Sequence, residues 1–445
     1  MSTSTSTRFA PPTNLRWLYV DFNSYFASVE QQMNPRLRDK PIAVVPVETD
    51  ATCAIAASYE AKAFGIKTGT PIYEAKKMCP GLICVLGRHE HYVEFHERLL
   101  DEIDHHIPVT DVCSIDEMAC RLMNNEISVA RSTEIAHSIK SGIAKNIGEY
   151  VRCSIGIAPS KYLAKVATDM KKPDGLTILQ PSDLPSRLLE LELRDLPGIG
   201  HSMEQRLNRA GICNMKQLLA MQPKHMRAVW GSLWGEKMWY YLRGYEIPDQ
   251  ETTRSSIGHS HVLAPEMRPP AQAWHIARRL TVKATARLRR MDYYAGAFSL
   301  SMRIENGPRL GLEARCPHAQ DSFAFLQILE EMWVALMHEA KGRRIKKVSV
   351  TLYALTPAGQ VQPDLFDSVS KIEEKKRDKN KKISHVMDKL NQKFGKDTVL
   401  LGMTSQQGKA FTGTKIAFTR IRCCYKRVIY TYSSHACPRP RGLYL

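Results

Sequence analysis

The sequence predicts an α+β protein of several domains, and three observations support this fold class. The chain has 445 residues, too many for one ordinary hydrophobic core, so two to four domains are expected. Its first part mixes short apolar runs, typical of buried strands, with stretches typical of helices. From Leu188 to Tyr245 the pattern changes to short helices, and a second block of strands and helices runs from Arg254 to Leu355.

The first predicted elements surround an acidic residue. Trp17–Asp21 is a short apolar run that ends in a carboxylate, which predicts a buried strand with an acid at its exit. A helix over Tyr25–Gln32 follows, because Asn23 and Ser24 are good N-caps. The next predicted elements are a strand over Pro41–Val45 and helices over Ser58–Gly65, Thr70–Met78 and Glu90–His105.

Two further acids mark a predicted turn. The segment that begins at Val109 predicts a strand, then a turn that carries Asp116 and Glu117, then a return strand over Met118–Met123. A helix over Ser132–Gly148 and a strand over Val151–Ala158 complete this part.

The second block predicts a separate small domain. A strand, a long basic helix, two strands, a helix and a strand follow one another there, and the polar stretch Pro248–Arg254 precedes them. Beyond Thr356 the chain is polar, with a dense block of Lys and Arg over Lys371–Lys382. We expect a flexible tail with one further helix over Ser384–Phe394.

The composition favours a globular protein with a polyanionic partner. Hydrophobic residues make up 43% of the chain and charged residues 24%, as in ordinary globular domains. Lys and Arg number 63 against 45 Asp and Glu, which gives a net charge of +18. So basic a chain favours nucleic acid as its partner, with an anionic membrane as the second choice.

The cysteines and the N-terminus indicate the compartment. None of the 11 cysteines has CxxC spacing, which favours buried free thiols in a reducing compartment over a zinc site. No apolar run is long enough to span a membrane, and residues 1–7 lack a signal-peptide segment. We therefore expect a cytoplasmic protein without a membrane partner.

The three acids Asp21, Asp116 and Glu117 together indicate metal chemistry. Acids on adjacent strand ends of one sheet can surround two divalent cations, which activate a 3′-hydroxyl and hold a triphosphate. Mg²⁺ suits this role because it prefers oxygen ligands. The alternative is that each acid is a solvated turn residue, and for any one of them alone that alternative is favoured.

Four collinear segments resemble the motifs of the Y-family DNA polymerases. The resemblance covers about residues 15–355, and the four segments together are highly specific. They are Asp21–Glu30 and Ser114–Met118 (the two carboxylate motifs), Ser58–Ile66 (fingers) and Ser154–Gly175 (palm, with Lys161, Lys165 and Lys172).

The resemblance implies a right-hand polymerase that copies damaged templates. It implies translesion synthesis by two-metal transfer of a dNTP to a primer 3′-hydroxyl, with low fidelity and no proofreading. The expected domains are a palm over 14–32 and 88–185, fingers over 33–87, a thumb with a helix-hairpin-helix over 186–247, a little finger over 254–356 and a flexible tail with a clamp-binding peptide over 357–445.

The resemblance also assigns roles to single residues. Asp21, Asp116 and Glu117 would bind two Mg²⁺ ions, with the Phe22 carbonyl as a fourth ligand. The nucleotide would contact Tyr25, Phe26, Tyr59, Lys62 and Lys161, with Phe26 at the steric-gate position against the sugar. The alternative for both Phe26 and Tyr25 is a core aromatic.

Two positions resemble the catalytic subunit of bacterial DNA polymerase V more than DNA polymerase IV. Lys62 stands where DNA polymerase IV has Arg, and Asn23 where it has a further acid. Asp388–Thr398 instead resembles the tail of some DNA polymerase IV relatives. The resemblance therefore leaves open whether the chain acts alone or needs activating SOS subunits.

Two features predict contacts with primer-template DNA. The turn with Gly198 and Gly200 resembles a helix-hairpin-helix, in which backbone N–H groups approach a phosphate. The long helix of the small domain carries a basic cluster, for which a solvated face is the alternative to phosphate contacts. The residues predicted there are Arg278, Arg279, Lys283 and Arg287.

A short peptide predicts a tether to the bacterial sliding clamp. Gln362-Pro363-Asp364-Leu365-Phe366 is similar to the peptide that bacterial polymerases insert into the clamp. Leu365 and Phe366 would fill an apolar pocket, and Gln362 would make polar contacts. The last stretch, from Arg422 to Leu445, resembles no known ending of the family.

Three other classes of function explain fewer of these features. The first is an inert or partner-dependent accessory protein of a mutagenic repair complex. An inert protein of this kind would have lost the three acids. A nucleotide cyclase would lack the hairpin motif, the basic small domain and the clamp peptide. A nonspecific DNA-binding module would need none of the acids. The polymerase explains the most features.

Overall fold

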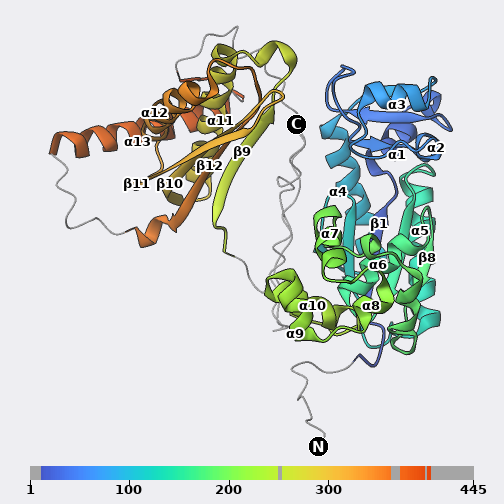
Figure 1. The fold of residues 1–445 in the computed structure, drawn as a ribbon. Helices are drawn as coiled ribbons and strands as arrows, with labels where there is room; N and C mark the ends of the chain where they lie inside the picture. Colours follow the sequence, from blue (N-terminus) through green and yellow to red (C-terminus); the bar gives the residue numbers. More distant parts are fainter. Residues whose placement is uncertain (1–11, 249–252, 362–370, 396–397, 402–445) are drawn as a thin grey trace, which may run out of the picture. The chain divides into compact units, whose positions relative to one another are not determined.

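The computed structural model describes residues 12–248, 253–361, 371–395 and 398–401 (Figure 1). The chain divides into two compact units between residues 249 and 250, within the polar stretch where the sequence predicted a boundary. The first unit is described over 12–248, and the second from residue 253 onward. None of the described helices is long and apolar enough to cross a membrane.

The first unit is built on a five-stranded sheet with the strand order β5-β6-β1-β7-β8. Its central strand β1 (Trp17–Phe22) pairs antiparallel with β6 (Glu117–Arg121) and with β7 (Cys153–Ala158). On the outer sides, β5 (Val109–Val112) is antiparallel to β6, and β8 (Leu176–Ile178) is parallel to β7. The two acidic motifs are therefore on neighbouring strands at the middle of the sheet.

Alternation along β1 gives the sheet two buried faces. Leu18 and Val20 pack with helices on one face, and these helices are α1 (Tyr25–Met33), α4 (His89–His106) and α5 (Val129–Asn146). Trp17 and Tyr19 point to the other face, in the core that includes residues of α6 (Lys161–Met170). Successive side chains of a strand point to opposite faces of the sheet. Because both faces are buried here, the strand at the centre of the sheet is apolar at nearly every position.

Helix α6 lies unusually close to the sheet. At Gly156 of β7, a Cβ atom would come within 2.0 Å of the Ala164 carbonyl oxygen of α6. Only glycine permits this approach, and it brings the side chains of α6 down to the end of β1.

A smaller three-stranded sheet follows in the sequence of the first unit. Its order is β3-β2-β4, and it has its own apolar core with two short helices. The elements are β2 (Ile42–Val45), β3 (Ala56–Ala57), α2 (Tyr59–Ala63), α3 (Ile72–Met78) and β4 (Ile83–Leu86). The sequence predicted β2 and both helices but missed the other two strands.

Four short helices end the first unit. They are α7 (His201–Arg209), α8 (Met215–Leu219), α9 (Pro223–Trp230) and α10 (Leu233–Tyr241), and they share a core with α6. The predicted hairpin turn precedes α7, where Gly198 has a φ of +95° and Gly200 is the N-cap. The left-handed φ explains the glycine at position 198.

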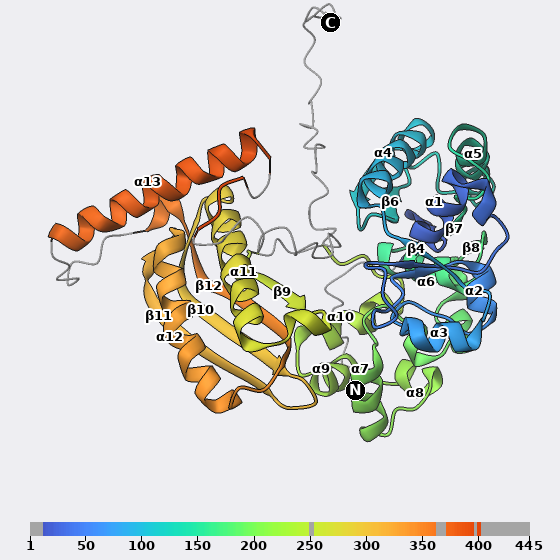
Figure 2. The same ribbon diagram turned by 90° about the horizontal axis from the view of Figure 1, so that it is seen from above.

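The second unit is a four-stranded antiparallel sheet with the order β11-β10-β12-β9, covered on one face by helices (Figure 2). The predicted succession of elements is confirmed. It consists of β9 (Ser256–Val262), α11 (Pro270–Arg290), β10 (Tyr293–Ile304), β11 (Arg309–Ala319), α12 (Ser322–Ala340) and β12 (Ile345–Pro357).

A packed helix corrects one part of the prediction for the segment beyond residue 357, namely where the helix begins. The helix α13 (Lys371–Lys393) packs against α11 and α12, whereas the sequence predicted flexibility beyond residue 357 and a helix only from Ser384. Its anchor is Asp388, which accepts hydrogen bonds at 2.6 and 2.9 Å from the buried Arg289 guanidinium of α11. A buried guanidinium requires such a partner.

Candidate active site

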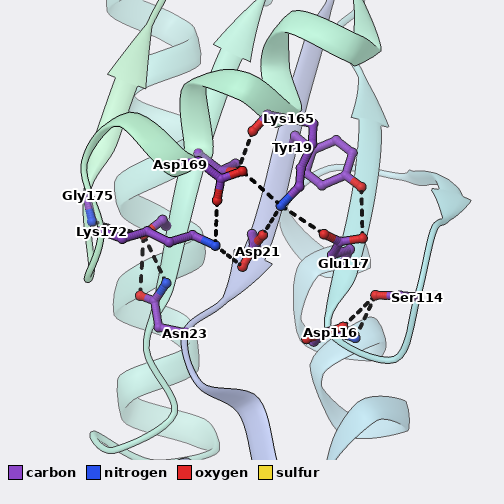
Figure 3. Close-up of polar contacts among 12 residues, drawn as sticks. Tyr19, Asp21, Asn23, Ser114, Asp116, Glu117, Lys165, Asp169, Lys172 and Gly175 are labelled. Carbon is purple, nitrogen blue, oxygen red and sulfur yellow. Dashed lines mark hydrogen bonds and ion pairs between the residues drawn. The ribbon is translucent and has the colours of Figure 1, made fainter. Parts of the chain in front are cut away.

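The structure brings the three predicted acids together at one end of β1 (Figure 3). Asp21 is directly opposite Glu117 in the β1–β6 register, so their side chains share a face of the sheet. The Phe22 N–H donates a hydrogen bond of 2.9 Å to the Asp116 carbonyl, which ties the acidic turn to β1. Phe22, the predicted carbonyl ligand, is the last residue of that strand.

Two lysines pair with these acids. Lys165 of α6 contacts Asp21, and its Nζ lies 2.8 Å from Glu117 Oε1. Lys172 Nζ lies 2.8 Å from Asp21 Oδ1. Asp169 joins both ammonium groups, at 3.4 Å from Lys165 and 2.7 Å from Lys172. The 5% exposed Asp21 therefore lies within a network of alternating charge.

The sequence named neither lysine as a partner of the acids. Helical spacing would have placed only Lys165 beside Asp169, because these two are four residues apart on α6, whereas Lys172 follows the end of that helix.

The pKa values follow this charge distribution. Burial alone would lower the pKa of Lys165, but attraction by Asp21, Glu117 and Asp169 outweighs it and raises the pKa. The pKa of Asp116 is raised by burial and by repulsion from Glu117 and Asp21, against a hydrogen bond of 2.5 Å that Ser114 Oγ donates to Asp116 Oδ1. The site thus holds its lysines charged and resists the ionisation of Asp116.

Asn23 has a supporting position beside the acids. Its side chain is 2% exposed. Its Nδ2 donates a hydrogen bond of 3.0 Å to Ser154 Oγ, and its Oδ1 accepts one of 2.8 Å from the Asp174 N–H. Asn23 therefore holds the loop that follows Lys172.

The residues predicted to contact a nucleotide lie in two groups. Phe26 stacks on Tyr92 of α4 with 4.5 Å between the ring centroids. Tyr25 is 3% exposed, and its hydroxyl donates a hydrogen bond of 2.6 Å to the Tyr92 carbonyl, which favours the alternative of a core aromatic for Tyr25.

The second group, Tyr59 and Lys62, is on α2 and interacts electrostatically with charged residues at the end of β1. Lys62 Nζ lies 4.4 Å from the centroid of the Tyr59 ring. Burial and repulsion from Lys172 lower the pKa of Lys62, while Asp21 opposes this shift. Tyr59 and Lys62 thus interact electrostatically with the residues at the end of β1.

Lys161 is paired with a different acid, Asp111. Its Nζ lies 3.0 Å from Asp111 Oδ2 of β5 and 5.6 Å from the centroid of the Trp17 ring. Lys165, one helical turn later, is the lysine of α6 that contacts Asp21 and Glu117.

The basic cluster predicted on α11 is not uniformly exposed. Arg279 is only 6% exposed, which corrects the prediction that it is a surface contact for DNA. Arg278, Lys283 and Arg287 are partly buried. The four side chains do not share one face of the helix, because residues 278 and 279 are adjacent, and none of the four is fully exposed.

The open face of the same sheet carries basic residues that the sequence did not single out. Arg309, Arg303 and Lys347 are neighbours in one row across β11, β10 and β12, and all three are exposed. They line a hollow of about 400 Å³. The next row is Gly311, Ser301, Ser349 and Ser260. Small side chains beside a basic row leave room for a polyanion.

The predicted clamp peptide, with Gln362, Leu365 and Phe366, lies outside the residues that the structure describes.

Comparison with known families accounts for most of the chain. The model of the impB/mucB/samB family matches residues 20–169. A model described as the thumb domain of DNA polymerase iota matches 194–246, and the C-terminal domain of the impB/mucB/samB family matches 254–365.

Individual relatives agree with these matches. The DNA polymerase IV of Moorella thermoacetica is 31% identical, over 86% of this chain and 94% of the relative. That of Pelotomaculum thermopropionicum is 30% identical with the same coverage. Among solved structures, a Y-family DNA polymerase chimera of Dbh and Dpo4 matches with a TM-score of 0.65 and 25% identity, over 77% of this chain and 99% of the chimera.

Proposed function

Because this chain belongs to the Y-family of translesion DNA polymerases and resembles DNA polymerase IV, we propose that Asp21, Asp116 and Glu117 are its catalytic carboxylates. The enzyme is a DNA-directed DNA polymerase, and its substrates are primer-template DNA and dNTPs. The observation that carries the proposal is the register of Asp21 with Glu117, with Asp116 tied to the same strand end.

The donor set fits divalent cations. Three acids lie at this end of β1, together with the backbone of Phe22, and hard cations such as Mg²⁺ prefer oxygen ligands. Among the described residues no acids, histidines or cysteines form a ready-made metal cage, and Lys165 lies between Asp21 and Glu117 instead. When bound, two such ions would polarise the primer 3′-hydroxyl and neutralise charge on the triphosphate.

The lysines give this chain its means of receiving a triphosphate. Lys165 and Lys172 are paired with the carboxylates in the structure described. Their ammonium groups could contact phosphate oxygens instead, which a Lys binds as a point charge. Lys62 and Tyr59 complete the cationic side of this space. The Phe26 ring, fixed by stacking on Tyr92, would lie against the sugar and exclude a 2′-hydroxyl.

The two units take different parts in this proposal. We assign the palm to 14–32 and 88–185, the fingers to 33–87, the thumb to 186–247 and the little finger to 254–356. The open sheet face with Arg303, Arg309 and Lys347 replaces α11 as the proposed phosphate contact of the second unit. The turn at Gly198 and Gly200 stays the proposed phosphate contact of the first unit. Low fidelity, the sliding clamp as partner through Gln362–Phe366 and a role in the SOS response remain parts of the proposal.

Primer extension tests the assigned carboxylates. The purified chain is expected to extend a primer on undamaged and abasic templates with Mg²⁺, and Asp116→Ala with Glu117→Ala is expected to abolish extension. The matched control, Glu134→Ala with Glu190→Ala, removes two exposed acids and should extend like the parent. Extension that survives in the Asp116/Glu117 variant would refute the site, whereas a parent active only with added SOS subunits would identify a partner-dependent enzyme.

A further inference from the structure

Helix α4 contacts the acidic turn through a buried histidine. His96 is fully buried, and its Nδ1 lies 2.7 Å from the carbonyl oxygen of Ile115, the residue before Asp116. A carbonyl oxygen only accepts hydrogen bonds, so Nδ1 carries the proton and donates. Ile115 is itself 2% exposed, so solvent does not compete for this contact.

His96 is held in one protonation state. Burial lowers its pKa, and its buried Nε2 has no hydrogen-bond partner among the described residues. The ring is therefore neutral with its proton on Nδ1, and it acts as a fixed donor. On the other side of the turn, the Phe22 N–H donates to the Asp116 carbonyl at 2.9 Å. The acidic turn is thus fastened from β1 and from α4.

One turn earlier on the same helix, Tyr92 fixes the ring of Phe26. The two rings stack with 4.5 Å between centroids and 27° between planes. The Tyr92 hydroxyl donates a hydrogen bond of 2.7 Å to Glu30 Oε1, and the fully buried Glu30 is paired with Arg88. The plane of Tyr92 is therefore set at both its ring and its hydroxyl.

Residues four apart lie on one face of a helix, so this face of α4 carries both contacts. We propose that it positions two separate functions of the polymerase: His96 sets the place of the Asp116–Glu117 turn, and Tyr92 sets the place of the sugar-excluding ring of Phe26. This inference rests on the proposed function, and both residues are positioning residues that need not touch a substrate.

The test measures two quantities. A general loss of folding would change both, whereas loss of one positioning contact should change only one of them. One is the Mg²⁺ concentration for half-maximal extension, with kcat at saturating dNTP. The other is the ratio of kcat/KM for dNTP to kcat/KM for rNTP. His96→Leu is expected to raise the half-saturating Mg²⁺ concentration and to lower kcat by about tenfold, with the nucleotide ratio unchanged. Tyr92→Leu is expected to lower the nucleotide ratio by about tenfold, with the Mg²⁺ dependence unchanged.

Conservative variants separate positioning from packing. His96→Asn keeps a donor near the position of Nδ1 and should resemble the parent, while His96→Gln keeps a polar amide but displaces it and should show the Mg²⁺ defect. Tyr92→Phe keeps the stacked ring and should keep most of the nucleotide selectivity. If His96→Leu fails to fold, the comparison of His96→Asn with His96→Gln tests whether the hydrogen bond to Ile115 positions the turn.

Three outcomes overturn the inference. Equal behaviour of His96→Asn and His96→Gln would show that the hydrogen bond to Ile115 does not position the turn. A joint shift of both quantities in either residue's variants would show a structural defect. An unchanged nucleotide ratio in Tyr92→Leu would remove the role of Tyr92. Failure of the proposed function looks different, because then extension by the parent would survive loss of Asp116 and Glu117.

Discussion

Asp116 and Asp21 are neighbours in the same site, but they have opposite electrostatic surroundings. Asp21 is paired with two ammonium groups, whereas the pKa of Asp116 is raised by burial and by the neighbouring carboxylates. A carboxyl whose pKa is higher in the folded state costs stability once it ionises. This cost appears as the pH rises from the ordinary Asp pKa through the raised one, and it is fully present above the raised pKa.

Replacing each acid by its amide should therefore have opposite effects on stability. Without divalent cations, Asp116→Asn is expected to raise the free energy of unfolding by on the order of 1 kcal/mol, and so to raise the melting temperature. Asp21→Asn should lower it, because Lys165 and Lys172 lose their main counter-charge. Thermal melts in a chelator at pH 7 and at about pH 4 measure both effects, and the gain from Asp116→Asn should shrink at the lower pH. A shift of the same sign in both variants would contradict this account.

At the residue scale, the acids could be predicted and their partners could not. Asp21, Asp116 and Glu117 stand at the ends of apolar runs, and a strand pattern is a local property of the sequence. The pairing of Lys165 with Asp21 depends on the close packing of α6 on β7 at Gly156, which is a tertiary contact. The burial of Arg279 is likewise decided by which side of α11 meets the sheet.

At the scale of elements, α13 shows how a tertiary anchor extends a helix. The predicted helix began at Ser384, but the structure has it begin at Lys371. The added turns are dense in charge and lack apolar periodicity, so no sequence pattern indicated them. The anchor lies in the second half of the helix, where Ser384 Oγ accepts a hydrogen bond of 3.3 Å from the Ser322 N–H and Asp388 pairs with Arg289.

The anchor of α13 can be tested by breaking and then replacing the ion pair. Asp388→Ala leaves the Arg289 guanidinium buried without its carboxylate, and is expected to destabilise the second unit by about 2 kcal/mol and to expose α13 to proteolysis. Adding Arg289→Met should recover much of this loss, because an apolar side chain needs no partner. Thermal melts and limited proteolysis of the two variants measure the effect, and Asp378→Ala, on an exposed side of the same helix, is the control. A double variant less stable than Asp388→Ala would refute the anchor.

At the scale of the whole molecule, the excess of 63 basic over 45 acidic residues predicted a polyanionic partner but not the surface that meets it. Two surfaces of the second unit compete for that role, namely the open sheet face and the helix α11. Their exposure favours the sheet, where Arg303, Arg309 and Lys347 form one row.

Salt dependence distinguishes the two surfaces. Replacing Arg303, Arg309 and Lys347 by Gln should weaken duplex binding at every sequence. It should also make the slope of log K against log salt shallower by about one unit for each phosphate that the protein no longer neutralises. The matched variant with Gln at Arg278, Lys283 and Arg287 should change the slope little. Fluorescence anisotropy over a salt series measures both, and a larger change in the α11 variant would restore the assignment made from sequence.

If the proposed function holds, the two lysines of the active site would also affect how the enzyme binds its nucleotide. With Asp21, Asp116, Glu117 and Asp169 all ionised, these four carboxylates and the two ammonium groups leave an excess of two negative charges there. In the proposed complex, two divalent cations and a triphosphate with roughly four negative charges would add almost nothing to this sum. Binding of the complete complex would then leave the net charge of the site nearly unchanged, while the ammonium groups would contact phosphate oxygens in place of carboxylates. A nucleotide without cations would instead add to the negative charge of the site, so the proposed site would favour the complete metal–nucleotide complex.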